Sequence, residues 1–176
     1  MSLGLIHIYC GDGKGKTTAA MGLILRAIGR EKKVLLTQFL KSGRSGELIS
    51  LERFDDFIDF LPGKPVNKFV WNMNEDEKEQ AKKEHTERFK EIIKKVKDKK
   101  YDLLVLDEII GTINNGFILV EDVIDFVKNK PAELEVVMTG RDPKKELIEI
   151  SNYVSEIKAV KHPFNEGIPA RIGIEQ

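Results

Sequence analysis

The sequence predicts a three-layer α/β fold, in which helices flank both faces of a mainly parallel central sheet. Four near-continuous apolar runs alternate with helical stretches along the 176 residues, and a glycine-rich turn joins the first run directly to a helix. Apolar runs without alternation are typical of strands buried on both faces. Strands that alternate with helices form parallel sheets with right-handed crossovers. We expect residues 1–176 to form one domain.

The expected strands are these apolar runs and two weaker segments. The strong runs are LIHIYC (5–10), KVLLTQFL (33–40), YDLLVLDE (101–108) and ELEVVMTG (133–140). Residues 57–62 and 153–160 are weaker candidates.

The expected helices lie between the strands. Residues 17–29 carry an apolar face made of Ala20, Leu23, Ile24, Ala27 and Ile28. Residues 75–97 are highly charged but carry a stripe at helical spacing, made of Ala81, His85, Phe89, Ile92 and Val96. Residues 120–129 follow the third strong strand. In residues 142–151, Asp142 is a candidate N-cap and Pro143 a candidate first helical residue.

Charge and cysteine content narrow the classes of function. The chain has 29 basic and 29 acidic residues, so its formal charge is zero, which argues against a protein that mainly binds nucleic acid. Cys10 is the only cysteine and ends an apolar run, which predicts a buried thiol in a reducing compartment. No apolar stretch approaches the roughly 20 residues of a membrane span, and the first residues do not resemble a secretory signal. We therefore expect a cytoplasmic protein with no membrane partner.

The segment HIYCGDGKGKTTAAMG, residues 7 to 22, predicts an anion site of the P-loop type. Exposed amides at a helix start, together with the helix dipole, attract phosphate, and glycines let the backbone close around it. Lys16 would reach the phosphates and the Thr17 hydroxyl would bind Mg²⁺. Cys10 stands where the usual G-x-x-x-x-G-K-[ST] pattern has its first glycine, so Gly11 must supply the turn. A dinucleotide fingerprint is excluded because its third glycine would fall at Lys16. The predicted ligand is a nucleoside triphosphate.

Two further strand ends supply the residues that a triphosphate site needs. The run LLVLDE ends in Asp107 and Glu108, whose carboxylates would hold Mg²⁺ directly or through its waters. Arg141 follows the run VVMTG at the sheet edge where ligands of α/β proteins lie, and its guanidinium can grip a phosphate. On these grounds alone, Arg141 is equally consistent with an ordinary surface arginine in a turn.

An aromatic segment stands apart from these motifs. Phe69 and Trp71 in NKFVWNMNE would face the same side of an extended segment. Composition favours a loop anchored to the core, and a flat platform for a large planar ligand is the alternative.

Taken together, these blocks resemble one family, the P-loop corrinoid adenosyltransferases, which transfer the 5′-deoxyadenosyl group of ATP to the cobalt of a corrinoid. The matching blocks run in order from residue 5 to residue 175 and are GDGKGKTTAA, KVLLTQFLK with Gly46-Glu47, KFVW, LLVLDE, VVMTGRDP and VSEIKAVKHPFNEGIPARIGIE. The displaced first glycine is itself similar to this family's form of the P-loop. The resemblance implies a RecA-like P-loop NTPase fold.

The resemblance also implies roles for individual residues. ATP would be bound by Gly11, Asp12, Gly13, Lys14, Gly15, Lys16, Thr17, Thr18 and Arg141. Lys16, Thr17 and Glu108 would be central to the chemistry. Thr17 and Glu108 would hold Mg²⁺ with Asp107 beside them, and Phe69 and Trp71 would lie against the corrin. The nucleophile would be Co(I), so the resemblance calls for no side-chain nucleophile.

The resemblance implies a flavoprotein as the external reductant and a homodimer as the assembly. The P-loop also leaves two rival functions open. The first rival is a P-loop ATPase or kinase-like enzyme that breaks the γ-phosphate bond. The second is a non-catalytic RecA-like module that binds nucleic acid, which the neutral charge disfavours. His162 is a weaker candidate for a cobalt ligand, because His-Pro turns are commonly structural.

Overall fold

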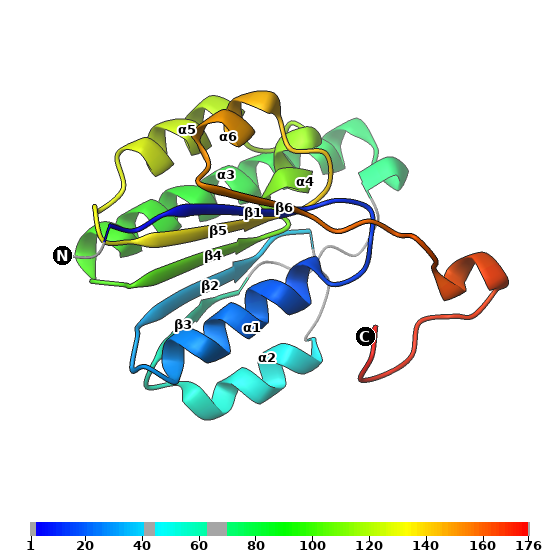
Figure 1. Cartoon of the computed structure of the whole chain (residues 1–176). Helices are drawn as coiled ribbons and strands as arrows, with labels where there is room; N and C mark the ends of the chain where they lie inside the picture. The colour runs from blue at the N-terminus through cyan, green and yellow to red at the C-terminus, as the bar shows by residue number, and fades with distance from the viewer. Residues whose placement is uncertain (1–2, 41–44, 63–69, 176) are drawn as a thin grey trace.

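The computed structural model describes residues 3–40, 45–62 and 70–175 (Figure 1). Its centre is a six-stranded sheet in the order β3-β2-β4-β5-β1-β6, and every neighbouring pair is parallel. The strands are β1 (Ile6–Cys10), β2 (Val34–Gln38), β3 (Ile58–Leu61), β4 (Leu103–Asp107), β5 (Glu135–Thr139) and β6 (Tyr153–Glu156). The predicted α/β class and parallel sheet are confirmed, including both weaker strands.

Helices cover both faces of this sheet, which gives three layers (Figure 1). One face carries α1 (Lys16–Ile28) and α2 (Gly46–Leu51). The other carries α3 (Glu75–Asp98), α4 (Ile109–Asn114), α5 (Val120–Lys128) and α6 (Lys145–Ile150). Three short 3-10 helices span Glu52–Phe54, Val70–Asn72 and Pro163–Glu166. None of the helices in the described part of the chain is both long and apolar enough to cross a membrane.

Two apolar clusters fill the space between the layers, because successive strand residues point to opposite faces. Leu35 and Leu104 enter the cluster under α3 to α6, whereas Leu36 and Val105 enter the cluster under α1 and α2. The charged helix α3 lies over the sheet as its stripe predicts, with Phe89, Ile92 and Val96 buried. The core therefore packs against both faces of the four internal strands, and the carboxyl ends of these parallel strands meet at one edge.

Two details of the helices differ from the prediction. The helix after β5 begins at Lys145, with Lys144 at its N-cap, so Asp142 is not the cap and Pro143 is not the first helical residue. Asp142 instead has φ 51°, and Asn114 Nδ2 donates to the carbonyls of both Arg141 and Asp142. This contact from α4 holds residues 141–142 in a turn, which delays the helix. The short helices α2 and α4 were not predicted, since neither is long enough to show a period.

His85 is a buried histidine in the stripe of α3. Its side chain stacks on Phe117 at 5.5 Å between ring centroids and lies 5.8 Å from Phe39. Only 2% of the residue is exposed, and its Nδ1 has no hydrogen-bond partner among the described residues. Burial, helped by the nearby Arg88 cation, lowers the pKa of His85 to about 4. This histidine is therefore neutral in the folded protein near pH 7.

We expect His85 to make the folded protein sensitive to mild acid. An unfolded histidine titrates near pH 6.5, so between pH 6.5 and 4 the unfolded chain binds a proton that the folded chain does not. The free energy of unfolding should fall in that range by about 2 kcal/mol more in wild type than in His85→Phe. Urea unfolding of both proteins at pH 7 and pH 4.5 measures the difference. Equal losses in the two proteins would contradict the assignment.

Candidate functional site

The glycine loop lies at the carboxyl edge of the sheet, between the end of β1 at Cys10 and the start of α1 at Lys16. The N-cap of α1 is Gly15, no side chain caps the helix, and its first turn contains no acidic residue. Backbone N–H groups at such a helix start bind anions, aided by the helix dipole. The structure therefore places the glycine loop directly before the uncapped start of α1, as the sequence predicts.

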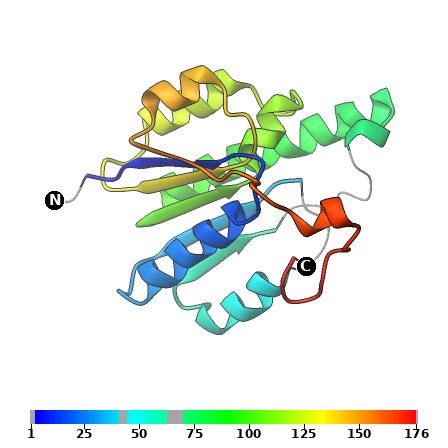
Figure 2. The ribbon, with the colours of Figure 1, turned by 45° about the vertical axis from the view of Figure 1, so that its right-hand side comes forward.

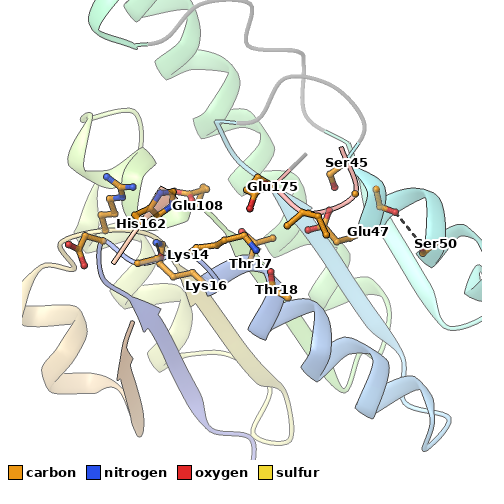
Figure 3. Close-up of a pocket in the computed structure, with 17 residues that line it drawn as sticks. Lys14, Lys16, Thr17, Thr18, Ser45, Glu47, Ser50, Glu108, His162 and Glu175 are labelled. Atoms are coloured by element: carbon orange, nitrogen blue, oxygen red, sulfur yellow. Dashed lines mark hydrogen bonds between the residues drawn. The ribbon is translucent and has the colours of Figure 1, made fainter. Parts of the chain in front are cut away.

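A cavity of about 730 Å³ opens over this loop (Figure 3). This volume is within the usual range for small-molecule sites. Its lining residues come from the loop and start of α1, from α2, from two strand ends and from the C-terminal tail, here residues 157–175. They are Asp12, Gly13, Lys14, Gly15, Lys16, Thr17, Thr18, Ser45, Gly46, Glu47, Ser50, Glu108, Arg141, His162, Gly173, Ile174 and Glu175. The structure thus brings together Asp12 to Thr18, Glu108 and Arg141 from the predicted set.

Lys16 is the buried cation of the loop. Only 8% of the residue is exposed, and its Nζ donates to the Gly13 carbonyl at 2.8 Å. Burial lowers the pKa of Lys16, and the positive charge of Arg141 lowers it further. Two cations that repel each other across a cavity favour a ligand with several negative charges. Arg141, predicted equally as a plain surface residue, lines this cavity.

Asp107 is fully buried behind the loop and joins three elements. Its Oδ1 accepts from the Thr17 hydroxyl at 2.9 Å and from the Thr139 hydroxyl at 2.7 Å, and its Oδ2 accepts from Gln38 Nε2 at 3.0 Å. A hydroxyl has one proton to donate, so the Thr17 proton points to Asp107 and its lone pairs point away. Asp107 therefore sets the orientation of the Thr17 hydroxyl.

Glu108 follows Asp107 with an unusual backbone. It has φ 62°, and its N–H donates to Thr139 Oγ1 at 2.9 Å. Leu40 and Asp142 also have positive φ, and each comes within three residues of the end of a strand, β2 or β5. Such conformations are costly outside glycine and are concentrated at functional sites. Glu108 combines this backbone conformation with a place in the lining of the cavity.

The C-terminal tail runs beside the glycine loop (Figure 2), and backbone hydrogen bonds join the two segments. Ile157 N–H donates to the Cys10 carbonyl and Gly13 N–H donates to the Ile157 carbonyl, both at 2.8 Å. Ala159 N–H donates to Asp12 Oδ1 at 3.0 Å, and this hydrogen bond lowers the pKa of Asp12.

This close approach explains the displaced first glycine. Gly11 has φ 105°, and a Cβ there would lie 2.3 Å from the Ile157 carbonyl oxygen. A Cβ on Gly13 would lie 2.8 Å from the same oxygen. Cys10, by contrast, is still part of β1 and is buried, and burial raises the pKa of its thiol, as expected of an inert cysteine. Gly11 and Gly13 are therefore needed for the close approach of the tail.

The end of the tail forms one wall of the cavity. Arg171 donates to Glu175 from its backbone N at 3.0 Å, from Nε at 3.2 Å and from Nη2 at 3.0 Å. These hydrogen bonds lower the pKa of Glu175 to about 2, with a smaller contribution from Lys14 of the loop. His162 Nδ1 accepts from Phe164 N–H at 3.2 Å, which gives this histidine a turn-forming role.

Several residues of the site were not predicted individually. Gln38 and Thr139 are polar residues at the carboxyl ends of mostly apolar strands. A polar residue at that position is the sequence feature that could have indicated a role in the site. Glu175 lay in a matching block to which no role was given. Of the predicted corrin contacts, Phe69 lies outside the described residues, and Trp71 is described only as part of the 3-10 helix Val70–Asn72.

We expect Gly13→Ala to release the tail from the loop. The added methyl group would collide with the Ile157 carbonyl, so residues 157–175 should become more susceptible to protease. Gly22→Ala is the matched control, because Gly22 lies within α1 and a Cβ there meets no atom within 4 Å apart from the adjacent backbone of its own helix. Limited proteolysis followed by mass spectrometry should show tail cleavage at least tenfold faster in Gly13→Ala. Equal cleavage in the two variants would contradict the role of the glycine.

Known proteins match this chain over almost its whole length. Residues 2–176 match the family model described as ATP:corrinoid adenosyltransferase BtuR/CobO/CobP. A corrinoid adenosyltransferase of Sinorhizobium sp is 36% identical over 176 residues, which cover 98% of this chain and 80% of that protein. Those of Escherichia coli K12 and Salmonella typhimurium LT2 are 33% and 32% identical, each covering 98% of this chain and 85% of the relative. The chain belongs to the ATP:corrinoid adenosyltransferase family.

Proposed function

We propose that this protein transfers the 5′-deoxyadenosyl group of ATP to the Co(I) centre of a corrinoid and releases triphosphate. Its place in the family supports the reaction. The observation that carries the proposal is the cavity over the glycine loop, where Lys16, Arg141 and the start of α1 gather positive charge. The product would be adenosylcobalamin or an adenosylated precursor.

In this reaction cobalt supplies the electron pair of the new Co–C5′ bond, and the C5′–O bond electrons leave with triphosphate. Negative charge develops on the departing oxygen, so fixed donors near the phosphates stabilise the transition state. We assign this role to Lys16, Arg141 and backbone amides of the segment Gly11 to Thr18, among them those of Asp12, Lys14 and Gly15, whereas the Gly13 N–H donates to the Ile157 carbonyl. Because cobalt is the nucleophile, no side chain needs to attack.

We propose Mg²⁺ as the metal that accompanies ATP. Thr17 and Glu108 are its proposed ligands, and Asp107 orients the Thr17 hydroxyl. The chemistry fits, since hydroxyl and carboxylate oxygens suit Mg²⁺ and the phosphates supply further ligands. When bound, Mg²⁺ neutralises charge on the triphosphate.

The corrinoid is proposed to lie against Phe69 and Trp71. Aromatic side chains there would exclude water and axial ligands from cobalt and so ease its reduction. Further proposals are a flavoprotein reductant, a homodimeric assembly and a cytoplasmic location.

The decisive assay is anaerobic. Purified protein is mixed with Mg-ATP and chemically reduced cob(I)alamin, the corrin spectrum is followed, and inorganic triphosphate is measured. We expect a light-sensitive product and one triphosphate per corrinoid, and Lys16→Ala should abolish both. Lys32→Ala is the control, because Lys32 is exposed and pairs with Asp102 away from the cavity. Release of ADP and orthophosphate with an unchanged corrin spectrum would favour the rival phosphoryl-transfer enzyme.

We expect Arg141→Met to weaken binding of ATP specifically. Loss of one charge-assisted contact to phosphate costs about 1.5–3 kcal/mol, so the KM for ATP should rise by at least tenfold. The KM for the corrinoid should stay within about twofold, since Arg141 lines the cavity at the glycine loop. Steady-state kinetics with each substrate varied in turn measures both. Equal rises in the two KM values would argue against a phosphate contact.

A further inference from the structure

Gln38 is a buried polar residue at the end of a strand that is otherwise apolar. Only 5% of it is exposed, and it is the register partner of Asp107 in the neighbouring strand β4. Its side chain donates from Nε2 to Asp107 Oδ2 at 3.0 Å. The backbone carbonyl of Gln38 accepts from Arg88 Nη1 at 3.0 Å. Burying a glutamine side chain costs free energy of folding unless its polar atoms form hydrogen bonds.

The contact with Asp107 determines how that carboxylate is turned. Gln38 occupies Oδ2, while Thr17 and Thr139 both donate to Oδ1. A carboxylate held at both oxygens cannot rotate freely about its χ2 bond. The Thr17 hydroxyl therefore meets a fixed acceptor and keeps its lone pairs directed away from Asp107.

Arg88 and the backbone hold Gln38 itself. Arg88 reaches from α3 with only 8% of the residue exposed, and its guanidinium lies 5.5 Å from the centre of the Phe39 ring. Phe39 N–H donates to the Asp107 carbonyl at 2.8 Å, so the residue after Gln38 is also tied to β4. The end of β2 is thus fixed from the helix on one side and from the strand on the other.

We infer that Gln38 is a positioning residue for the metal and triphosphate site, acting through Asp107 on Thr17, with Arg88 as its anchor. The inference rests on the proposed role of Thr17 as a metal ligand. Groups that orient a metal ligand typically change metal affinity by 10–100-fold when they are removed. Loss of the Gln38 amide removes its hydrogen bond to Oδ2 of Asp107, so the carboxylate that accepts from the Thr17 hydroxyl is held less firmly.

Binding of Mn²⁺ in the presence of ATP and without corrinoid tests the inference, because no adenosyl transfer occurs without Co(I). Free Mn²⁺ is measured by EPR, and ATP binding without metal is measured by calorimetry. Gln38→Met, similar in shape but without a donor, should weaken Mn²⁺ binding about tenfold and leave metal-free ATP binding within twofold. Thr37→Val is the control, because Thr37 is buried on the same strand but donates to the Leu61 carbonyl at 3.2 Å. It should keep wild-type Mn²⁺ affinity.

Each outcome bears on the inference. Unchanged Mn²⁺ affinity in a folded Gln38→Met protein overturns it while leaving the proposed metal site intact. Wild type that binds no Mn²⁺ with ATP overturns both. If Gln38→Met does not fold, Gln38→Asn keeps a polar amide but is one methylene shorter and cannot reach Asp107 Oδ2, and the same loss is expected. In an Asp107→Asn background, Gln38→Met should add less than twofold, whereas a full tenfold effect there would exclude the route through Asp107.

Discussion

The arrangement of the site depends on the hydrogen bonds that the buried carboxylate of Asp107 accepts. Asp107 lies at the end of β4 and receives hydrogen bonds from α1, β5 and β2 through Thr17, Thr139 and Gln38. A carboxylate buried this completely is tolerated only when donors surround it, so the elements that supply them must be precisely placed. The parallel sheet provides that precision, because the carboxyl ends of its central strands meet at one edge.

The second constraint is the approach of the C-terminal tail to the glycine loop. Backbone groups of Ile157 contact both Cys10 and Gly13, and the space left at Gly11 and Gly13 excludes any side chain. The glycine loop is therefore held between β1 and the tail. Further along the tail, Glu175 lines the cavity. A loop held on both sides presents its amides to a ligand with little rearrangement, which lowers the entropic cost of binding.

Chemistry and architecture support each other at the strand ends. Positive φ at Leu40, Glu108 and Asp142 turns the chain sharply as each strand reaches the site. This places Glu108 and Arg141 on the cavity rather than along the sheet. A reaction in which cobalt is the nucleophile and triphosphate departs needs positive charge and fixed amides rather than a general base, and the described residues around the cavity supply these.

The sequence by itself determined the α/β class, the order of strong strands, the phosphate loop and the acidic strand end, because each depends on residue type at short spacing. It also indicated the family, through blocks of residues that run in order along the chain. It mispredicted the start of α6 at Asp142, since the contact from Asn114 that holds that turn comes from a distant helix. The roles of Gln38, Thr139 and Ile157 were likewise decided only by the tertiary structure. Their partners lie between 31 and 147 residues away along the chain, and no local pattern encodes which strands become neighbours or which backbone groups meet.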